Sequence, residues 1–165
     1  HLPRFNKATD DRHPVSEFET IRGPIDIVLF EGWCVGEPPL ENYAGPYNDR
    51  ERRDDPYGIW AKWSRSALNR DYQTLNATLD ALVMIKVPSF EVVRQSRWLQ
   101  ECKLHEQVST MQPSQKLFGL MSKSEVMDYV DLFERHTEHM FKTLMDRCDL
   151  LIERDANFNY WLAQN

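Results

Sequence analysis

The stretch that decides the fold is Pro24-Ile25-Asp26-Ile27-Val28-Leu29-Phe30-Glu31-Gly32-Trp33-Cys34-Val35-Gly36. Its run of Ile, Val, Leu and Phe, bounded by Pro and Gly, is typical of a strand buried on both faces, as in the centre of a parallel α/β sheet. Ligands of such sheets bind beyond the carboxyl ends of the strands, which places Glu31 and Gly32 at the expected edge of a site. A carboxylate there can hold Mg²⁺, directly or through water, and the glycines let backbone approach a ligand closely. The alternative is an ordinary strand end followed by a turn.

The overall composition is that of a globular protein. The chain has 165 residues, enough for a real core, and we expect residues 1–165 to form a single domain. No apolar run is long enough to cross a bilayer. A formal net charge of -6 argues against a surface built for nucleic acid or for anionic lipid. The composition therefore predicts neither a nucleic-acid partner nor a membrane partner.

The cysteines and the first residue give two further expectations. The three cysteines, Cys34, Cys102 and Cys148, are far apart and show no paired spacing, so neither a disulfide framework nor a zinc cluster is expected. This usage favours a reducing compartment, and we expect a cytoplasmic location. The chain begins with His1 and not with Met, and Leu-Pro-Arg-Phe follows directly without a polar leader. This beginning predicts a piece that starts within a longer protein, or a processed chain.

Residues 1–20 are dense in charge, are punctuated by prolines and lack apolar periodicity, so they predict a loop. Its candidate functional residues are Arg4, Lys7, Asp10, Asp11 and Arg12. Such a loop is either a solvated turn or a segment that contacts a substrate. In the second case either aspartate could take a proton from an acceptor hydroxyl, and the three cationic side chains could pair with a carboxylate or a phosphate.

Residues 37–57 form a long connection that is rich in proline and charge, which is typical of a lid or a substrate loop, with plain disorder as the competitor. Residues 57–72 follow with helical periodicity. Their spacing places Trp60, Trp63 and Ala67 on one face. Such an aromatic stripe favours a position in the core and not a platform on which a ligand stacks.

Residues 81–87 form a second strand of the buried type, ended by a proline, and a long helix is expected over residues 89–107. On that helix Arg94, Arg97 and Glu101 share one face. Two arginines that follow a strand can clamp phosphates with their planar donor forks. The alternative is a solvated face with an Arg97–Glu101 ion pair.

The C-terminal third continues the alternation. Ser122 with Glu125 forms a capping-box pattern that opens a helix over residues 122–145. His136 and His139 lie on it, and without a third ligand we interpret them as surface histidines. Residues 148–153 predict a third strand, and the aromatic tail 158–162 is expected to dock on the domain. Strands that alternate with long helices predict an α/β fold with a largely parallel sheet.

Several segments together resemble one family, the D-glycerate 3-kinases and their relatives among the P-loop kinases, a group that includes uridine kinase, pantothenate kinase and phosphoribulokinase. The matching pieces are Leu-Pro-Arg-Phe-Asn-Lys-Ala-Thr-Asp-Asp-Arg (2–12), Val-Leu-Phe-Glu-Gly-Trp-Cys-Val-Gly (28–36), Asn-Asp-Arg-Glu (48–51) leading to Trp60, Pro-Ser-Phe-Glu-Val-Val (88–93) and Arg-Gln-Ser-Arg-Trp-Leu-Gln-Glu (94–101). The resemblance covers nearly the whole chain. It implies a three-layer, P-loop kinase-like α/β fold.

The resemblance also implies an activity: ATP-dependent, Mg²⁺-assisted transfer of the γ-phosphoryl group to a primary hydroxyl of a small hydroxy acid, giving 3-phosphoglycerate. Glu31 then resembles the carboxylate at the end of a Walker B-type strand. Asp10 and Asp11 occupy the segment where related kinases keep an acidic residue near the acceptor hydroxyl. Arg94 and Arg97 resemble lid arginines that close over the phosphates. As candidates for the glycerate carboxylate we infer, on physical grounds, the cations Arg4, Lys7 and Arg12.

Two departures from the family pattern matter. Asn6 stands where the family leads us to expect Asp, which removes one carboxylate from the acceptor loop. No Gly-x-x-x-x-Gly-Lys-Ser/Thr phosphate loop occurs in the chain, so the N-terminal nucleotide-loop unit is expected to be missing. We therefore expect little or no ATP binding and no turnover by this chain alone. We also expect an exposed sheet edge that a missing N-terminal segment or a partner covers.

Two other functions stay open at this point. One is a kinase-derived, non-catalytic protein that lost its nucleotide loop and serves as a binding module. The other keeps the kinase but changes the acceptor to a nucleoside, pantothenate or a sugar phosphate, because pocket shape decides acceptors and the sequence does not give that shape.

Overall fold

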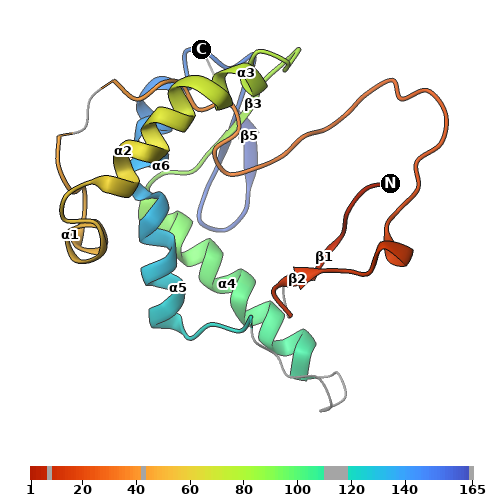
Figure 1. Ribbon diagram of the computed structural model, residues 1–165, viewed down its shortest axis with the longest axis horizontal. Coiled ribbons are helices and arrows are strands. Elements are labelled where there is room, and N and C mark those ends of the chain that lie inside the picture. Colours follow the sequence, from red (N-terminus) through yellow and green to blue (C-terminus); the bar gives the residue numbers. More distant parts are fainter. Residues whose placement is uncertain (7–8, 42–43, 110–118, 164–165) are drawn as a thin grey trace.

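The computed structural model describes residues 1–6, 9–41, 44–109 and 119–163. Figure 1 shows two regions of different character. Residues 1–32, which we call the arm, extend away from the remainder of the molecule as a small hairpin and a long irregular segment. Residues 33–163, which we call the body, pack helices around a small sheet. The chain is thus a mixed α/β protein, as the alternation of strands and helices predicts.

The sheet of the body has three strands in the order β3-β4-β5. Strands β3 (Val83–Lys86) and β4 (Leu150–Arg154) are parallel, whereas β5 (Tyr160–Leu162) pairs antiparallel with β4. The second and third predicted strands are therefore confirmed, and the sheet that they form is small and only partly parallel. The aromatic tail docks as predicted, but it does so through strand pairing, since its side chains remain exposed.

Three helices follow β3. They are α4 (Phe90–Ser109), α5 (Lys123–Val130) and α6 (Glu134–Thr143), the last two joined by the 3-10 turn η3 (Asp131–Phe133). Helices α4 and α6 contact the sheet, and α5 packs on α4. Ser122 and Glu125 form the predicted capping box, with each side chain bonded to the other residue's backbone N–H. The helix predicted over residues 122–145 is thus present with one 3-10 turn inside it. Within the described residues, no helix combines the length and the apolar character needed to cross a bilayer.

The core of the body consists of two clusters. The first contains Met84 of β3 with Met140 and Leu144, and the second contains Phe90, Val126 and Val130; the two clusters share no buried residue. Trp33 packs against both clusters and so joins them. The chain therefore enters the body at a point where one aromatic side chain is surrounded by packed apolar groups.

A second helical segment precedes β3. It runs through α2 (Ile59–Ala67), the π-helical turn η2 (Leu68–Tyr72) and α3 (Gln73–Asn76), and a short α1 (Asp49–Asp54) lies before it in the connection that the sequence predicts as a loop. The helix over residues 57–72 is confirmed.

The predicted core position of the α2 tryptophans is wrong. Trp60 and Trp63 are exposed by 70% and 67%, and the buried side chain of this segment is Leu68 in the π-helical turn. Amphipathic spacing shows which residues share a helix face, but it does not show which face meets the core. Here the aromatic face of α2 meets solvent.

The buried strand predicted from Ile25 to Phe30 is also absent. Those residues have no strand conformation, and Leu29 is 92% exposed. A strand is stable only when neighbouring strands satisfy its backbone groups, and none of the described residues pairs with this segment. The arm instead holds the two-residue strands β1 (Phe5–Asn6) and β2 (Asp11–Arg12), followed by the 3-10 turn η1 (Val15–Glu17).

Candidate functional site

The carboxyl edge of the parallel strands is where a ligand of this sheet is expected. Strand β3 ends at Lys86, and α4 begins at Phe90, so the amino end of this twenty-residue helix lies at that edge. Strand β4 ends at the same edge with Arg154, because Lys86 is paired with Glu153 in the ladder. The predicted phosphate-binding arginines, Arg94 and Arg97, lie in the first turns of α4.

Arg94 faces η3 and is held there by carboxylates. Its guanidinium lies 2.6 Å from Asp131 Oδ1 and 3.8 Å from Glu134 Oε1, and it covers the ring of Phe90. Partial burial acts to lower the pKa of Arg94, but the neighbouring carboxylates outweigh it and raise the pKa above its ordinary value. Arg94 is therefore a fixed cation that already has an anionic partner.

Arg97 forms the pair with Glu101 that the sequence offers as the alternative to phosphate binding. Its Nη1 donates to Glu101 Oε2 over 2.7 Å, and the Glu101 side chain is only 1% exposed. The other oxygen of Glu101 accepts from the backbone N–H of Met121 over 2.8 Å. This ion pair thus ties α4 to the segment before α5. The predicted common face of Arg94, Arg97 and Glu101 is confirmed, and in this structure it is an interior ion-pair face.

Arg154 is a third arginine at this edge, and the sequence reasoning missed it. Its residue is 7% exposed, its Nη2 donates to Ser96 Oγ over 2.7 Å, and its guanidinium lies over the ring of Phe158. Its buried Nε has no hydrogen-bond partner among the described residues. The signal in the sequence is an arginine at the end of a predicted strand, directly before the Asp-Ala-Asn turn.

Residues 33–38, which we call the anchor loop, fix the chain directly after Glu31 and Gly32. Trp33 stacks on Phe133 with ring centroids 4.6 Å apart, and its indole N–H donates to Thr137 Oγ1 over 2.9 Å. At the other end of the loop, the Glu37 backbone oxygen accepts from the side-chain amides of Gln73 and Asn76. Both ends of the anchor loop are thus held by helices of the body.

The interpretation of His136 and His139 as surface histidines is wrong, because both bind the anchor loop. His136 Nδ1 lies 2.8 Å from a carboxylate oxygen of Glu37, whose residue is 1% exposed, and His136 Nε2 lies 3.3 Å from Ser64 Oγ. His139 Nε2 lies 3.2 Å from the backbone oxygen of Pro38. The two histidines lie on one face of α6 and hold consecutive residues of the loop.

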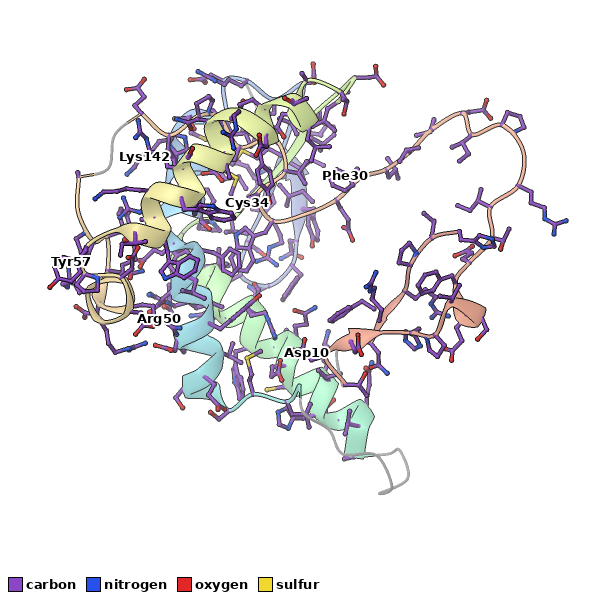
Figure 2. All side chains as sticks on the ribbon, viewed as in Figure 1. Asp10, Phe30, Cys34, Arg50, Tyr57 and Lys142 are labelled. Atoms are coloured by element: carbon purple, nitrogen blue, oxygen red, sulfur yellow. The ribbon has the colours of Figure 1, made fainter. Side chains whose placement is uncertain are left out.

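Burial also controls the chemistry of Cys34 in the anchor loop. Desolvation, reinforced by the charge of Glu37 and a hydrogen bond to it, raises the pKa of the Cys34 thiol to about 12. A thiol with that pKa stays protonated at neutral pH and is a poor nucleophile. Cys34 is therefore a packing residue, and Figure 2 shows it among the side chains of the body. All three cysteines are free thiols.

Glu31 lies just outside the body. Its side chain is exposed and forms no hydrogen bond or ion pair with another described residue. Its neighbour Phe30 is on the arm where the arm reaches the body (Figure 2). The position is therefore that of a carboxylate with both oxygens free, two residues before the rigid anchor loop.

The predicted acceptor-loop residues lie in the hairpin of the arm. Asp10 has a φ of 51° and forms the turn, and Asp11 accepts from the backbone N–H of Arg12 over 2.7 Å. Arg4 is exposed and uses its backbone oxygen to accept from His13, while Lys7 lies outside the described residues. Figure 2 places Asp10 well away from the junction of arm and body. The structure thus does not bring these aspartates together with Glu31.

The described residues contain no cluster of three or more His, Cys, Asp or Glu side chains with the geometry of a metal site. Magnesium in kinases is held by one or two carboxylates together with substrate phosphates, so a preformed protein cage is not required. The free oxygens of Glu31 fit the part of a single carboxylate ligand. The phosphate-binding backbone loop that ATP requires is not among the residues of this chain.

Comparison with known proteins gives one distant relative. No protein-family model matches the chain. The D-glycerate 3-kinase of Arabidopsis thaliana chloroplasts is 29% identical over 136 residues, which cover 80% of this chain and 26% of that protein. The chain thus spans about a quarter of the length of this curated relative. The similarity indicates a distant, kinase-like relationship.

Proposed function

We propose that this chain is the C-terminal portion of an ATP-dependent kinase that phosphorylates a small hydroxy acid, with D-glycerate as acceptor and 3-phosphoglycerate as product. The observation that carries this proposal is the similarity to a plant D-glycerate 3-kinase over 80% of the chain. The mixed α/β architecture and the carboxylate that follows an apolar run support it. In this proposal the fold is that of a P-loop kinase.

Phosphoryl transfer depends on positioning and on neutralising charge more than on covalent chemistry. Glu31 would hold Mg²⁺, which when bound would neutralise charge on the phosphates. The anchor loop would keep Glu31 at a fixed distance from the carboxyl edge of β3, because Trp33 and Glu37 are bound to helices. Asp10 or Asp11 would orient the acceptor hydroxyl and accept its proton, which requires the arm hairpin to lie nearer Glu31 than it does in this structure.

The lid arginines require an exchange of partners in this proposal. Arg94 and Arg97 are paired with Asp131 and Glu101, so a phosphate has to compete with a carboxylate for each guanidinium. Arg94 is the better placed of the two, because its partner Asp131 is itself partly exposed whereas Glu101 is buried. We therefore assign phosphate contact first to Arg94 and a structural role to the Arg97–Glu101 pair. Arg4, Lys7 and Arg12 remain the proposed contacts of the acceptor carboxylate.

A segment outside residues 1–165 completes the site in this proposal. The apolar run from Ile25 to Phe30 is exposed, β3 is paired on one side only among the described residues, and Val83 and Ile85 on one face of β3 are exposed as well. A parallel strand that carries the phosphate loop would cover both surfaces and would bring backbone N–H groups to the ATP phosphates. Without it we expect this chain to be inactive.

The test compares two proteins in one kinase assay with ATP, Mg²⁺ and D-glycerate. One is the protein encoded by the complete open reading frame, and the other is residues 1–165. We expect 3-phosphoglycerate from the longer protein only. Glu31→Gln should lower kcat about a hundredfold or more, because it removes a charged metal ligand. Glu19→Gln is the matched control on the arm, since its carboxylate has no assigned role, and it should leave the rate unchanged. Uridine, pantothenate and ribulose 5-phosphate test the alternative acceptors.

A non-catalytic binding module is the second candidate. It is favoured by the absence of a phosphate loop from the sequence and by the carboxylates that occupy both lid arginines. Intact mass of the native protein against its open reading frame separates the candidates. A native protein that starts at His1 and shows no activity would establish the module. The cytoplasmic location stays a prediction, as the name of the plant relative places that protein in the chloroplast.

A further inference from the structure

A pocket of about 260 Å³ opens at the amino ends of β3 and β4, at the opposite end of these strands from the α4 arginines. Ala81 and Leu82 reach it directly before β3, and Arg147 and Asp149 reach it directly before β4. The anchor loop and α3 form its other wall. The proposed kinase chemistry uses none of these residues.

The polar side chains of this wall are already held in place. Asn76 accepts from the backbone N–H of Gly36 through Oδ1 and donates to the Glu37 backbone oxygen through Nδ2, over 3.2 and 3.1 Å. Gln73 donates through Nε2 to the same oxygen over 3.0 Å. These bonds leave one N–H of Asn76 and the Oε1 of Gln73 without a partner among the described residues. A ligand would therefore meet hydrogen-bonding groups whose orientation is fixed in advance.

Gly36 allows the close approach on which this wall depends. Its φ is +78°, and a Cβ at this position would lie 2.7 Å from the Leu82 side chain. Glycine thus lets the anchor loop contact Leu82, the residue directly before β3. Leu82 and the buried Leu144 give the pocket an apolar floor.

The opposite side of the pocket carries two charges of different sign. Asp149 Oδ2 accepts from the backbone N–H of Leu82 over 2.7 Å, which fixes the carboxylate and leaves Oδ1 free. The guanidinium of Arg147 is exposed and forms no hydrogen bond or ion pair with a described residue, Asp149 included. Nearly all other arginines of the body have a carboxylate or backbone oxygen as partner. Arg147 is thus a cation that lines a pocket without an anion.

We propose that this pocket binds a small carboxylic acid that carries a hydrogen-bond donor at its other end, such as a hydroxy acid or an amino acid. The ligand carboxylate pairs with the planar fork of Arg147. Its hydroxyl or ammonium group donates to Asp149 Oδ1 and Gln73 Oε1, and its short carbon chain lies on Leu82. This site is separate from the α4 arginines, which lie at the other end of the same strands, and from the proposed acceptor residues, which lie in the arm hairpin.

The test is a calorimetric and NMR titration of residues 1–165 with D-glycerate, L-alanine and propionate, of which propionate lacks the donor. We expect millimolar binding of D-glycerate or L-alanine, with propionate at least tenfold weaker. Arg147→Gln and Asp149→Asn should each weaken binding tenfold or more. Arg70→Gln, a matched control at an exposed arginine outside the pocket, should not.

D-glycerate and L-alanine show which kind of hydrogen-bond donor the pocket takes, since D-glycerate offers a hydroxyl group and L-alanine an ammonium group. Circular dichroism and backbone NMR spectra of each variant check that it is folded, which is expected because both charged side chains are exposed. Absence of binding by both probes, equal binding of propionate, or binding that survives Arg147→Gln in a folded protein would overturn the proposal.

Discussion

The arm and the body contain similar apolar runs that end in different structures. Residues 25–30 and β3 are both short, β-branched and bounded by proline. Strand β3 forms because β4 lies beside it in register and the first core cluster covers its inner face at Met84. The run from Ile25 to Phe30 has neither a neighbouring strand nor a covering helix among the described residues, and it stays irregular and exposed. The difference shows that a strand propensity is realised only where the backbone finds a partner.

The largest difference is expected when an aspartate replaces an apolar residue first in the body and then in the arm. Val130 is fully buried in the second core cluster, so Val130→Asp should destabilise the body by more than about 4 kcal/mol and leave little folded protein. Leu29→Asp, at a side chain that is 92% exposed, should change the free energy of unfolding by less than about 0.5 kcal/mol. Urea unfolding followed by circular dichroism measures both. A large destabilisation by Leu29→Asp in residues 1–165 would contradict the distinction between the regions.

The next effect concerns the junction between arm and body. His136→Ala leaves the buried Glu37 carboxylate without its imidazole partner and should cost about 3 kcal/mol. In a Glu37→Gln background the same substitution should cost clearly less, because no charge is left buried. A double-mutant cycle from urea unfolding gives the coupling. Costs that add without coupling would show that the anchor loop does not depend on this contact.

A smaller, pH-dependent effect is expected at Cys34. Its pKa is about 12 in the folded body against 9.0 for the free side chain, so the unfolded chain loses the thiol proton first as pH rises. Stability should therefore be complete below pH 9 and decline between pH 9 and 12, and Cys34→Ala should flatten that decline.

Alkylation gives an independent measure of the same thiol. At pH 8, iodoacetamide should modify Cys34 about a thousandfold more slowly than an ordinary thiol, because the thiolate fraction falls tenfold for each pKa unit. Mass spectrometry of the alkylated protein resolves the three cysteines. Rapid modification of Cys34 in the folded protein would contradict its assignment as a buried packing residue.

Much of the body could be predicted from the sequence. The strands β3 and β4, helix α4, the capping box of α5 and the Arg97–Glu101 pair all follow from patterns that act over a few residues. What the sequence did not predict depends on partners that are far apart in the chain. The exposed tryptophans of α2 and the pairing of β5 belong to this class.

The same rule applies to the candidate site. Local patterns place Glu31 at the end of an apolar run and the arginines on one face of α4, and the structure retains both features. The contact of His136 with Glu37 joins residues 99 positions apart, so no local pattern reveals it. Arg154 reaches this edge only because β4 pairs beside β3 and brings its end next to Ser96 of α4, a contact between residues 58 positions apart.

The central claim of the proposed function is that residues 25–30 become a sheet strand when a neighbouring strand from outside residues 1–165 is present. Hydrogen exchange measured by mass spectrometry tests it, on residues 1–165 and on the protein from the complete open reading frame. In residues 1–165 we expect the amides of this run to exchange at the rate of an unstructured peptide while those of β4 are protected. In the longer protein we expect both segments to be protected. Protection of the run in residues 1–165 alone, or its absence in the longer protein, would contradict the claim.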